Sequence, residues 1–302
     1  MNNYQGWLNV YKPLGQSSFA VVKKIKKHFK LDKIGHGGTL DLLAEGVLPI
    51  AIGKTTKLIP FINSDIKEYE FEIKWGEQTT TDDAEGDIID QSDFIPSFKE
   101  ISNILIKFNG EILQKPPKAS AIKINGKRAY NLLRNNIDFE IKEKKVFIYS
   151  SEIIDSSKDI ITKIKLKCGK GFYVRSFARD IAEILKTKGH VKSLKRTKVG
   201  KFTEKNANLL DDLLKIGQTI TEFKGFHTSL SMLDDILAYE VDDEKSRYNI
   251  SKGKSININV NKLNNPLLNS TDRKIVFLTD KGKVISFGKL NGDLFKPSKV
   301  LI

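Results

Sequence analysis

The stretch Gly35-His36-Gly37-Gly38-Thr39-Leu40-Asp41 places three glycines in four residues, directly before the apolar run Leu42–Ile52. Glycine permits positive φ values and a close approach of the backbone, at an entropic cost that packing alone rarely requires. We therefore predict a loop through Asp41 that has a functional purpose. No Lys-Ser/Thr pair follows this glycine loop as in a P-loop, and no GxGxxG spacing is present, so a nucleotide cofactor has weak support. By default, a single aspartate after such a loop is a helix cap or a turn residue.

Hydrophobic periodicity predicts helices and strands on both sides of this loop. Apolar residues recur at helical spacing from Phe19 to Phe29 after the possible cap Ser17, and lysines occupy the other face of this helix. Strict alternation from Tyr69 to Trp75 predicts a half-buried strand. Further predictions are strands at 162–168, 275–279 and 284–288, helices at 98–108 and 174–188, a polar loop at 79–86, and an exposed basic segment at 118–134.

The composition is that of a globular chain without disulfides. The 302 residues are 39% hydrophobic and 29% charged, with a mean hydropathy of −0.32, which excludes a disordered or fibrous protein. The single cysteine, Cys168, excludes multi-cysteine zinc sites, and the four histidines show no metal-ligand spacing, so we expect no metal. The run Leu42–Ile52 is too short to span a membrane and the N-terminus lacks a signal pattern, so we expect a cytoplasmic protein.

The net charge of +14, from 51 basic and 37 acidic residues, makes a polyanion the expected partner. The abundance of lysine fits an AT-rich coding bias, but such a bias does not explain the charge itself. Only seven of the basic residues are arginines, so each arginine is a candidate for a specific role.

Several ordered motifs resemble the TruB family of tRNA pseudouridine synthases, of bacterial type. The residues 35–50 are similar to the signature of that family. Leu42, Thr80 and Ala119 depart from its pattern, where proline, aspartate and an aromatic residue are usual. The similarity covers most of residues 7–200. Its other landmarks are Lys12-Pro13 with Gly15 and Ser17-Ser18, Lys67-Glu68-Tyr69, the stretch 76–86 with Thr79, Thr81 and Asp83, Pro116-Pro117 with Ser120-Ala121-Ile122-Lys123, and Gly171-Phe172-Tyr173-Val174-Arg175.

The resemblance implies a role for each of six residues. Asp41 would be the catalytic aspartate, and a carboxylate is a competent nucleophile or base. Arg175 would pair with Asp41 and keep it ionised. Tyr69 would be a catalytic residue that stacks on the flipped uracil and accepts a proton at C5. The substrate-binding residues would be Tyr69 again, His36, which would pack into the disrupted RNA loop, and Tyr173 and Leu194, which would line the pocket.

The resemblance also implies the architecture. We expect an α+β fold, with a catalytic domain (1–238) on a mixed, mainly antiparallel sheet and a small, β-barrel-like PUA-type domain (239–302) that binds RNA. An insertion at 115–136 would fold over the RNA. A phosphate-contacting track would consist of Lys192, Lys195, Arg196, Lys198 and Lys201.

The implied reaction is the isomerisation of uridine 55 in the TΨC loop of transfer RNA to pseudouridine. The implied partner is the TΨC stem-loop, with no cofactor, no membrane and no obligate protein partner, and the implied state is a monomer. Two alternatives stay open: a related enzyme for another RNA uridine or one guided by a small RNA, and a tRNA-folding chaperone whose chemistry is secondary.

Overall fold

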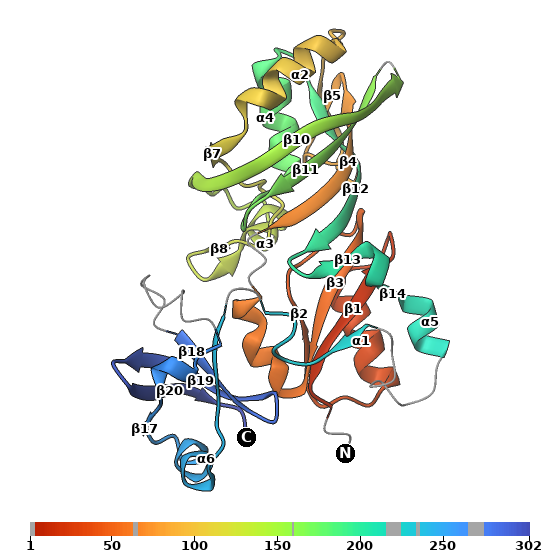
Figure 1. Cartoon of the computed structure of the whole chain (residues 1–302). Coiled ribbons are helices and arrows are strands. Elements are labelled where there is room, and N and C mark those ends of the chain that lie inside the picture. Colours follow the sequence, from red (N-terminus) through yellow and green to blue (C-terminus); the bar gives the residue numbers. More distant parts are fainter. Residues whose placement is uncertain (1–3, 63–65, 159, 216–224, 234–235, 265–274) are drawn as a thin grey trace.

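The computed structural model describes residues 4–62, 66–158, 160–215, 225–233, 236–264 and 275–302 (Figure 1). Most strands in these ranges form one large sheet, in the order β14-β1-β3-β12-β4-β11-β10-β7, with β2, β13 and β15 paired to β3, β12 and β1. Two of its pairings, β12–β3 and β1–β14, are parallel and the others are antiparallel. The strands are β1 Gly6–Lys12, β2 Ile34–His36, β3 Ala44–Ile52, β4 Lys67–Trp75, β7 Gly110–Gln114, β10 Lys144–Lys158, β11 Ile161–Cys168, β12 Gly189–Val199, β13 Phe202–Thr203, β14 Asn208–Leu209 and β15 Phe226–His227.

Helices α1 and α2 begin at side-chain caps. Ser17 accepts a hydrogen bond from the Ala20 amide, and Ser97 forms a reciprocal capping box with Glu100. Figure 1 shows α2 and α4 together on one side of β4, β10 and β11, where Phe177 meets Phe71 and residues near it in the main core. The helices are α1 Ser18–His28, α2 Phe98–Lys107, α3 Ala129–Arg134, α4 Val174–Ile184, α5 Leu210–Lys215 and α6 Glu244–Ser251, with 3-10 turns at Gly53–Phe61, Glu204–Asn206 and Val260–Lys262.

A second sheet follows the large one in the chain. Its strands are β16 Leu237–Glu240, β18 Ile275–Asp280, β19 Lys283–Asn291, β20 Leu294–Val300 and β17 Ile256–Asn257, in that spatial order. The α+β class, with its mixed, mainly antiparallel sheet and small C-terminal β unit, is therefore confirmed. One apolar cluster joins the two sheets, because Phe277 and Val284 pack in the same cluster as Trp7 and Phe202. No helix of the described residues is long and apolar enough to cross a membrane.

Three local predictions need correction. Residues 35–41 are not entirely a loop, because β2 pairs with β3 as far as His36, and three residues are too few for a period to be visible. Helix α4 ends at Ile184 rather than at residue 188, since Lys186 takes a left-handed conformation (φ 57°). The basic segment 118–134 is not wholly exposed, because Ala129 and Leu132 are buried. This segment contains β8 Lys123–Ile124, β9 Lys127–Arg128 and α3. A separate hairpin, earlier in the chain, consists of β5 Glu77–Thr79 and β6 Ile88–Gln91.

Gly46 is required where β3 meets β12. Its φ is 106°, and a Cβ atom there would overlap the carbonyl oxygen of Arg196 on the neighbouring strand. We expect Gly46→Ala to lower the free energy of unfolding by about 2 kcal/mol or more, from the left-handed strain and the overlap together.

Urea unfolding of Gly46→Ala and Gly110→Ala measures this effect. Gly110 is the matched control, because its φ is 102° and a Cβ atom added there would meet nothing within 4 Å. We expect Gly110→Ala to cost only about 1 kcal/mol, from backbone strain alone. Equal losses in the two variants would contradict the close approach of β12.

Candidate active site

A cavity of about 470 Å³ lies between the loop that precedes β3, the start of β4, the middle of β12 and the first turn of α4. Asp41, Tyr69, Tyr173, Arg175 and Leu194 all line it, so the structure brings five of the six predicted site residues together. Its other lining residues are Gly38, Thr39, Leu40, Lys67, Ala119, Ser120, Ala121, Tyr130, Gly171, Phe172, Val174 and Arg196. The wall therefore combines an aromatic and aliphatic surface with one carboxylate, an arrangement that suits a flat heterocycle.

Arg175 lies between two carboxylates. Its Nε is 3.0 Å from Asp41 Oδ2, and its Nη1 is 3.2 Å from Asp83 Oδ2. The side chains of Arg175 and Asp83 are 6% and 2% exposed, whereas that of Asp41 is 37% exposed. Arg175 also donates to the carbonyl oxygens of Thr81 and Ala119, both at 3.1 Å. Asp83 and two carbonyl oxygens thus hold the buried guanidinium in place. Asp41 is the most exposed of these three charged groups.

Asp83 is held by the turn of residues 79–86. Thr81 Oγ1 donates to Asp83 Oδ1 at 2.5 Å, the Glu85 amide donates to the same oxygen at 3.0 Å, and Thr79 Oγ1 donates to the Asp83 carbonyl at 2.6 Å. Sequence reasoning placed this stretch in a loop and included Asp83 among the landmarks of the family resemblance, but it gave Asp83 no role. The signal that could have found it was the pair of consecutive aspartates in a chain whose few arginines need partners.

Arg196 holds the loop that carries Asp41. It is 1% exposed and lies opposite Tyr69 on β4 and Gly46 on β3. Its Nε donates to the Val47 carbonyl at 2.9 Å, and its Nη2 donates to the Gly38 carbonyl at 3.1 Å. The prediction that Arg196 contacts phosphate is therefore wrong, because the strand buries this side chain beneath the cavity.

The other members of the predicted phosphate track differ in their surroundings. Lys192 is exposed, whereas Lys195 pairs with Glu204 at 3.1 Å and Lys198 pairs with Glu68 at 3.3 Å. Lys201 donates to the carbonyl oxygens of Ser231 and Leu233. These lysines therefore do not form one row of unpaired cations.

Tyr69 is a buried phenol beside Asp41. It is 7% exposed, and burial raises its pKa to about 12, although the charge of Arg196 and a hydrogen bond with it act in the opposite direction. The hydroxyl is consequently neutral at physiological pH. A neutral phenol offers its ring for stacking and its proton for donation, but it accepts protons weakly.

The two other pocket residues are placed by the elements that flank the cavity. Tyr173 directly precedes α4, and the Nζ of Lys144 lies 4.4 Å from the centre of its ring. Burial raises the pKa of Tyr173. Leu194 lies on β12, two residues before Arg196, and is 7% exposed.

His36 is the predicted site residue that does not line the cavity. It is half-buried at the end of β2, and its Nδ1 is buried with no hydrogen-bond partner among the described residues. Burial and the charge of Arg196 lower its pKa, which favours the neutral imidazole.

Lys12 is a charged residue that sequence reasoning gave no role. Its side chain is completely buried at the end of β1, and Nζ donates to the carbonyl oxygens of Pro13 and Gln16. Burial lowers its pKa to about 8, and the opposing effect of Asp41 is the largest among the nearby charges. Lys12 therefore places a positive charge behind the Asp41 loop, and it loses this charge as the pH rises through about 8.

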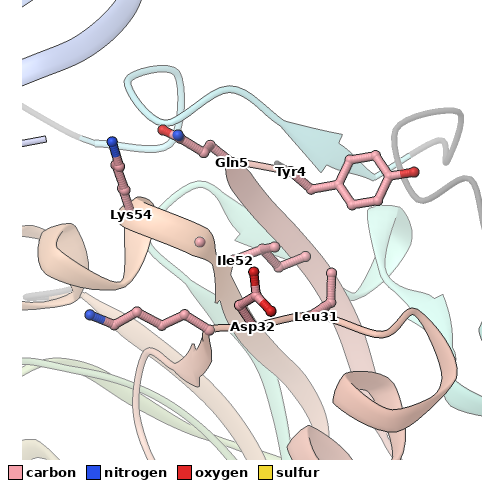
Figure 2. Close-up of a pocket in the computed structure, with 8 residues that line it drawn as sticks. Tyr4, Gln5, Leu31, Asp32, Ile52 and Lys54 are labelled. Atoms are coloured by element: carbon pink, nitrogen blue, oxygen red, sulfur yellow. The ribbon is translucent and has the colours of Figure 1, made fainter. Parts of the chain in front are cut away.

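A smaller cavity, of about 160 Å³, lies at the end of β3 and contains none of the predicted site residues. Figure 2 shows Asp32 and Ile52 in its interior and Gln5 and Lys54 at its edge. No group of three or more His, Cys, Asp or Glu side chains that could hold a metal ion occurs in the part of the chain that the structure describes.

Comparison with known proteins gives matches over the residues that build the cavity around Asp41. Residues 26–174 match the family described as TruB family pseudouridylate synthase (N terminal domain). Residues 175–239 match the tRNA pseudouridylate synthase B C-terminal domain. The first range contains Asp41 and Tyr69, and the second begins at Arg175.

Individual relatives match along most of the chain. A tRNA pseudouridine synthase B from Caulobacter sp. (strain K31) is 40% identical over 251 residues, which is 83% of this chain and 81% of that protein. One from Rickettsia bellii (strain OSU 85-389) is 38% identical over 303 residues, which covers 99% and 98%. A crystal structure of a Cbf5-Nop10-Gar1 complex shares the fold, with a TM-score of 0.72 and 23% identity over 98% of this chain and 85% of that one. The chain therefore belongs to the TruB family of pseudouridine synthases.

Proposed function

We propose that this chain is a tRNA pseudouridine synthase that converts uridine 55 of the TΨC loop to pseudouridine, with Asp41 as the catalytic carboxylate. The observation that carries this proposal is the position of Asp41. Its carboxylate is partly exposed to a cavity with apolar walls, while Arg175 Nε lies 3.0 Å away and is itself buried. A carboxylate that is paired with a buried guanidinium on one side and exposed to the cavity on the other is suited to attack a bound nucleoside.

The isomerisation exchanges one bond of the nucleoside for another. The N1–C1′ glycosidic bond breaks, the uracil rotates, a C5–C1′ bond forms, C5 loses its proton and N1 gains one, so the atoms balance without an oxidant or reductant. Three first steps suit Asp41: attack on ribose C1′, attack on uracil C6, or removal of the 2′ proton to give a glycal. In all three, the carboxylate must be unprotonated in order to act as a nucleophile or base.

The uridine must leave its stack before its ribose or C5 is accessible, at a cost of a few kcal/mol. We assign Tyr69 to stacking on the flipped base, and Leu194 and Tyr173 to the walls of its pocket. The buried, neutral hydroxyl of Tyr69 supports a role in orienting the uracil better than a role as a strong base at C5. His36 lies two residues before Gly38, which lines the cavity. We assign His36 to the space that the uridine leaves in the RNA loop.

We assign the surface outside the cavity to RNA binding. The net charge of +14 favours a polyanion. We propose that the TΨC stem-loop is the recognised part of the tRNA, that the insertion 115–136 covers it, and that the unit 239–302 binds RNA. We further propose that the protein acts in the cytoplasm as a monomer.

The proposal is tested on an unmodified TΨC stem-loop RNA. We expect the purified protein to form pseudouridine at the position of uridine 55, detected by mass-labelled RNA analysis, and nowhere else in the loop. A stem-loop has little global fold for a chaperone to correct, so conversion identifies an enzyme. A folded protein that binds this RNA without converting it would favour the chaperone alternative, and conversion at another position would favour a different target uridine.

Asp41→Asn is expected to abolish pseudouridine formation and to leave RNA affinity within about threefold, because the change is nearly isosteric and removes the charge and nucleophilicity of one exposed carboxylate. Product formation is measured by RNA mass analysis and affinity by filter binding. Substantial residual product would remove Asp41 from the catalytic role.

Tyr69→Ala is expected to lower kcat at least about tenfold more than Tyr69→Phe, because phenylalanine retains a stacking face. Because the pKa of Tyr69 is about 12, the ratio of kcat between wild type and Tyr69→Phe should stay constant from about pH 6 to 9. Wild-type turnover in both variants would contradict the placement of Tyr69. A ratio that changes across this range would contradict a neutral phenol.

A further inference from the structure

Helix α4 carries a second, half-buried arginine one turn beyond Arg175. The side chain of Arg179 is 16% exposed, and its Nη1 is 2.9 Å from Asp82 Oδ2. Its Nη2 donates to Asp180 Oδ1 at 2.7 Å and to the Lys115 carbonyl at 2.9 Å. One guanidinium therefore connects α4, the turn 79–86 and the first residue of the insertion 115–136.

Asp82 directly precedes Asp83, the buried partner of Arg175. It adopts a left-handed backbone conformation with φ of 60°, which is uncommon for a residue other than glycine. Its amide donates to the Thr79 carbonyl at 3.3 Å, and its side chain is 10% exposed. Two consecutive aspartates thus meet two arginines that are four residues apart and lie on the same face of α4.

The partners that fix Arg175 belong to segments that Arg179 also holds. Thr81 and Asp83, which contact Arg175, flank Asp82 in the turn 79–86. Ala119, which also accepts from Arg175, lies four residues beyond Lys115 in the insertion. A shift of either segment would therefore move the groups that direct Arg175 toward Asp41.

Arg179 does not line the catalytic cavity. It lines a separate cavity of about 630 Å³, together with Asp82, Lys115 and Lys118, on the other side of the turn and the insertion. Any effect of this arginine on a uridine held beside Asp41 must therefore act through its neighbours rather than by direct contact.

We infer that Arg179 and Asp82 form a positioning pair for the reaction: they hold the turn 79–86 and the start of the insertion against α4, and thereby keep Arg175 directed at Asp41. This inference rests on the proposed function. A positioning pair should affect the rate of the bound complex, because small displacements of catalytic groups are costly to the rate, whereas an RNA contact would affect affinity.

The experiment measures kcat and KM on the TΨC stem-loop for Arg179→Ala, Arg179→Lys, Asp82→Asn and the double variant Arg179→Ala/Asp82→Asn. We expect Arg179→Ala to lower kcat by about 10- to 100-fold with KM within about threefold. Arg179→Lys should recover part of the loss, because lysine keeps the charge without the planar fork. The double variant should be no slower than the slower single variant, since both residues act through one contact.

Removing one partner of a buried ion pair also lowers stability. Rates are therefore compared well below the unfolding midpoint and divided by the folded fraction from circular dichroism. If Arg179→Ala does not fold, the nearly isosteric Asp82→Asn decides, with an expected loss of kcat that is smaller, because the contacts of Arg179 with Asp180 and Lys115 remain. The control is Lys165→Ala, which breaks the Lys165–Glu152 ion pair (3.7 Å) between β11 and β10; neither residue lines the cavity, so kcat should be unchanged.

Three results would overturn the inference: a wild-type kcat in folded Arg179→Ala or Asp82→Asn, a rise in KM alone, or additive losses in the double variant. Each of these results requires an active wild-type protein. A wild type that forms no pseudouridine would instead contradict the proposed function, so the two failures are distinguishable.

Discussion

The buried guanidinium of Arg196 is the constraint on which the rest of the site depends. A charge without contact with water must have its donors satisfied, and here carbonyl oxygens of the loop and of β3 accept from it. β12 pairs with both β3 and β4, so this one side chain lies where the Asp41 loop and Tyr69 come together. Gly46 permits that meeting, because only a residue without Cβ fits against the backbone of Arg196.

A second set of polar contacts organises the opposite wall. The first turns of α4 present Arg175, Ser176 and Arg179 to the turn 79–86 and to the insertion. The Ser176 hydroxyl donates to the same Lys115 carbonyl that Arg179 contacts, at 2.8 Å. The side of the cavity that faces Arg196 is thus fixed by the sheet, and the side that faces the insertion is fixed by a helix.

Local patterns in the sequence predicted the elements that local forces determine. The cap at Ser17, the alternation from Tyr69 to Trp75 and the glycines before Asp41 all correspond to features of the structure. The pattern of lysines around Arg196 was misleading, because a strand paired on both sides can bury one basic residue among exposed ones. The local sequence does not indicate that β12 pairs with both β3 and β4. The partnership of Asp83 with Arg175 joins residues 92 positions apart and was equally invisible.

Two arginines of this site, Arg175 and Arg196, donate hydrogen bonds to backbone carbonyl oxygens. Arg175 takes the carbonyls of Thr81 and Ala119, and Arg196 takes those of Gly38 and Val47. Every amino acid has a carbonyl oxygen, so the side chain at such a position can change while the contact persists. Ala119 illustrates this freedom, since its side chain is only a methyl group and its carbonyl oxygen still accepts from Arg175. The geometry of the site can therefore persist when the side chains that surround it are substituted.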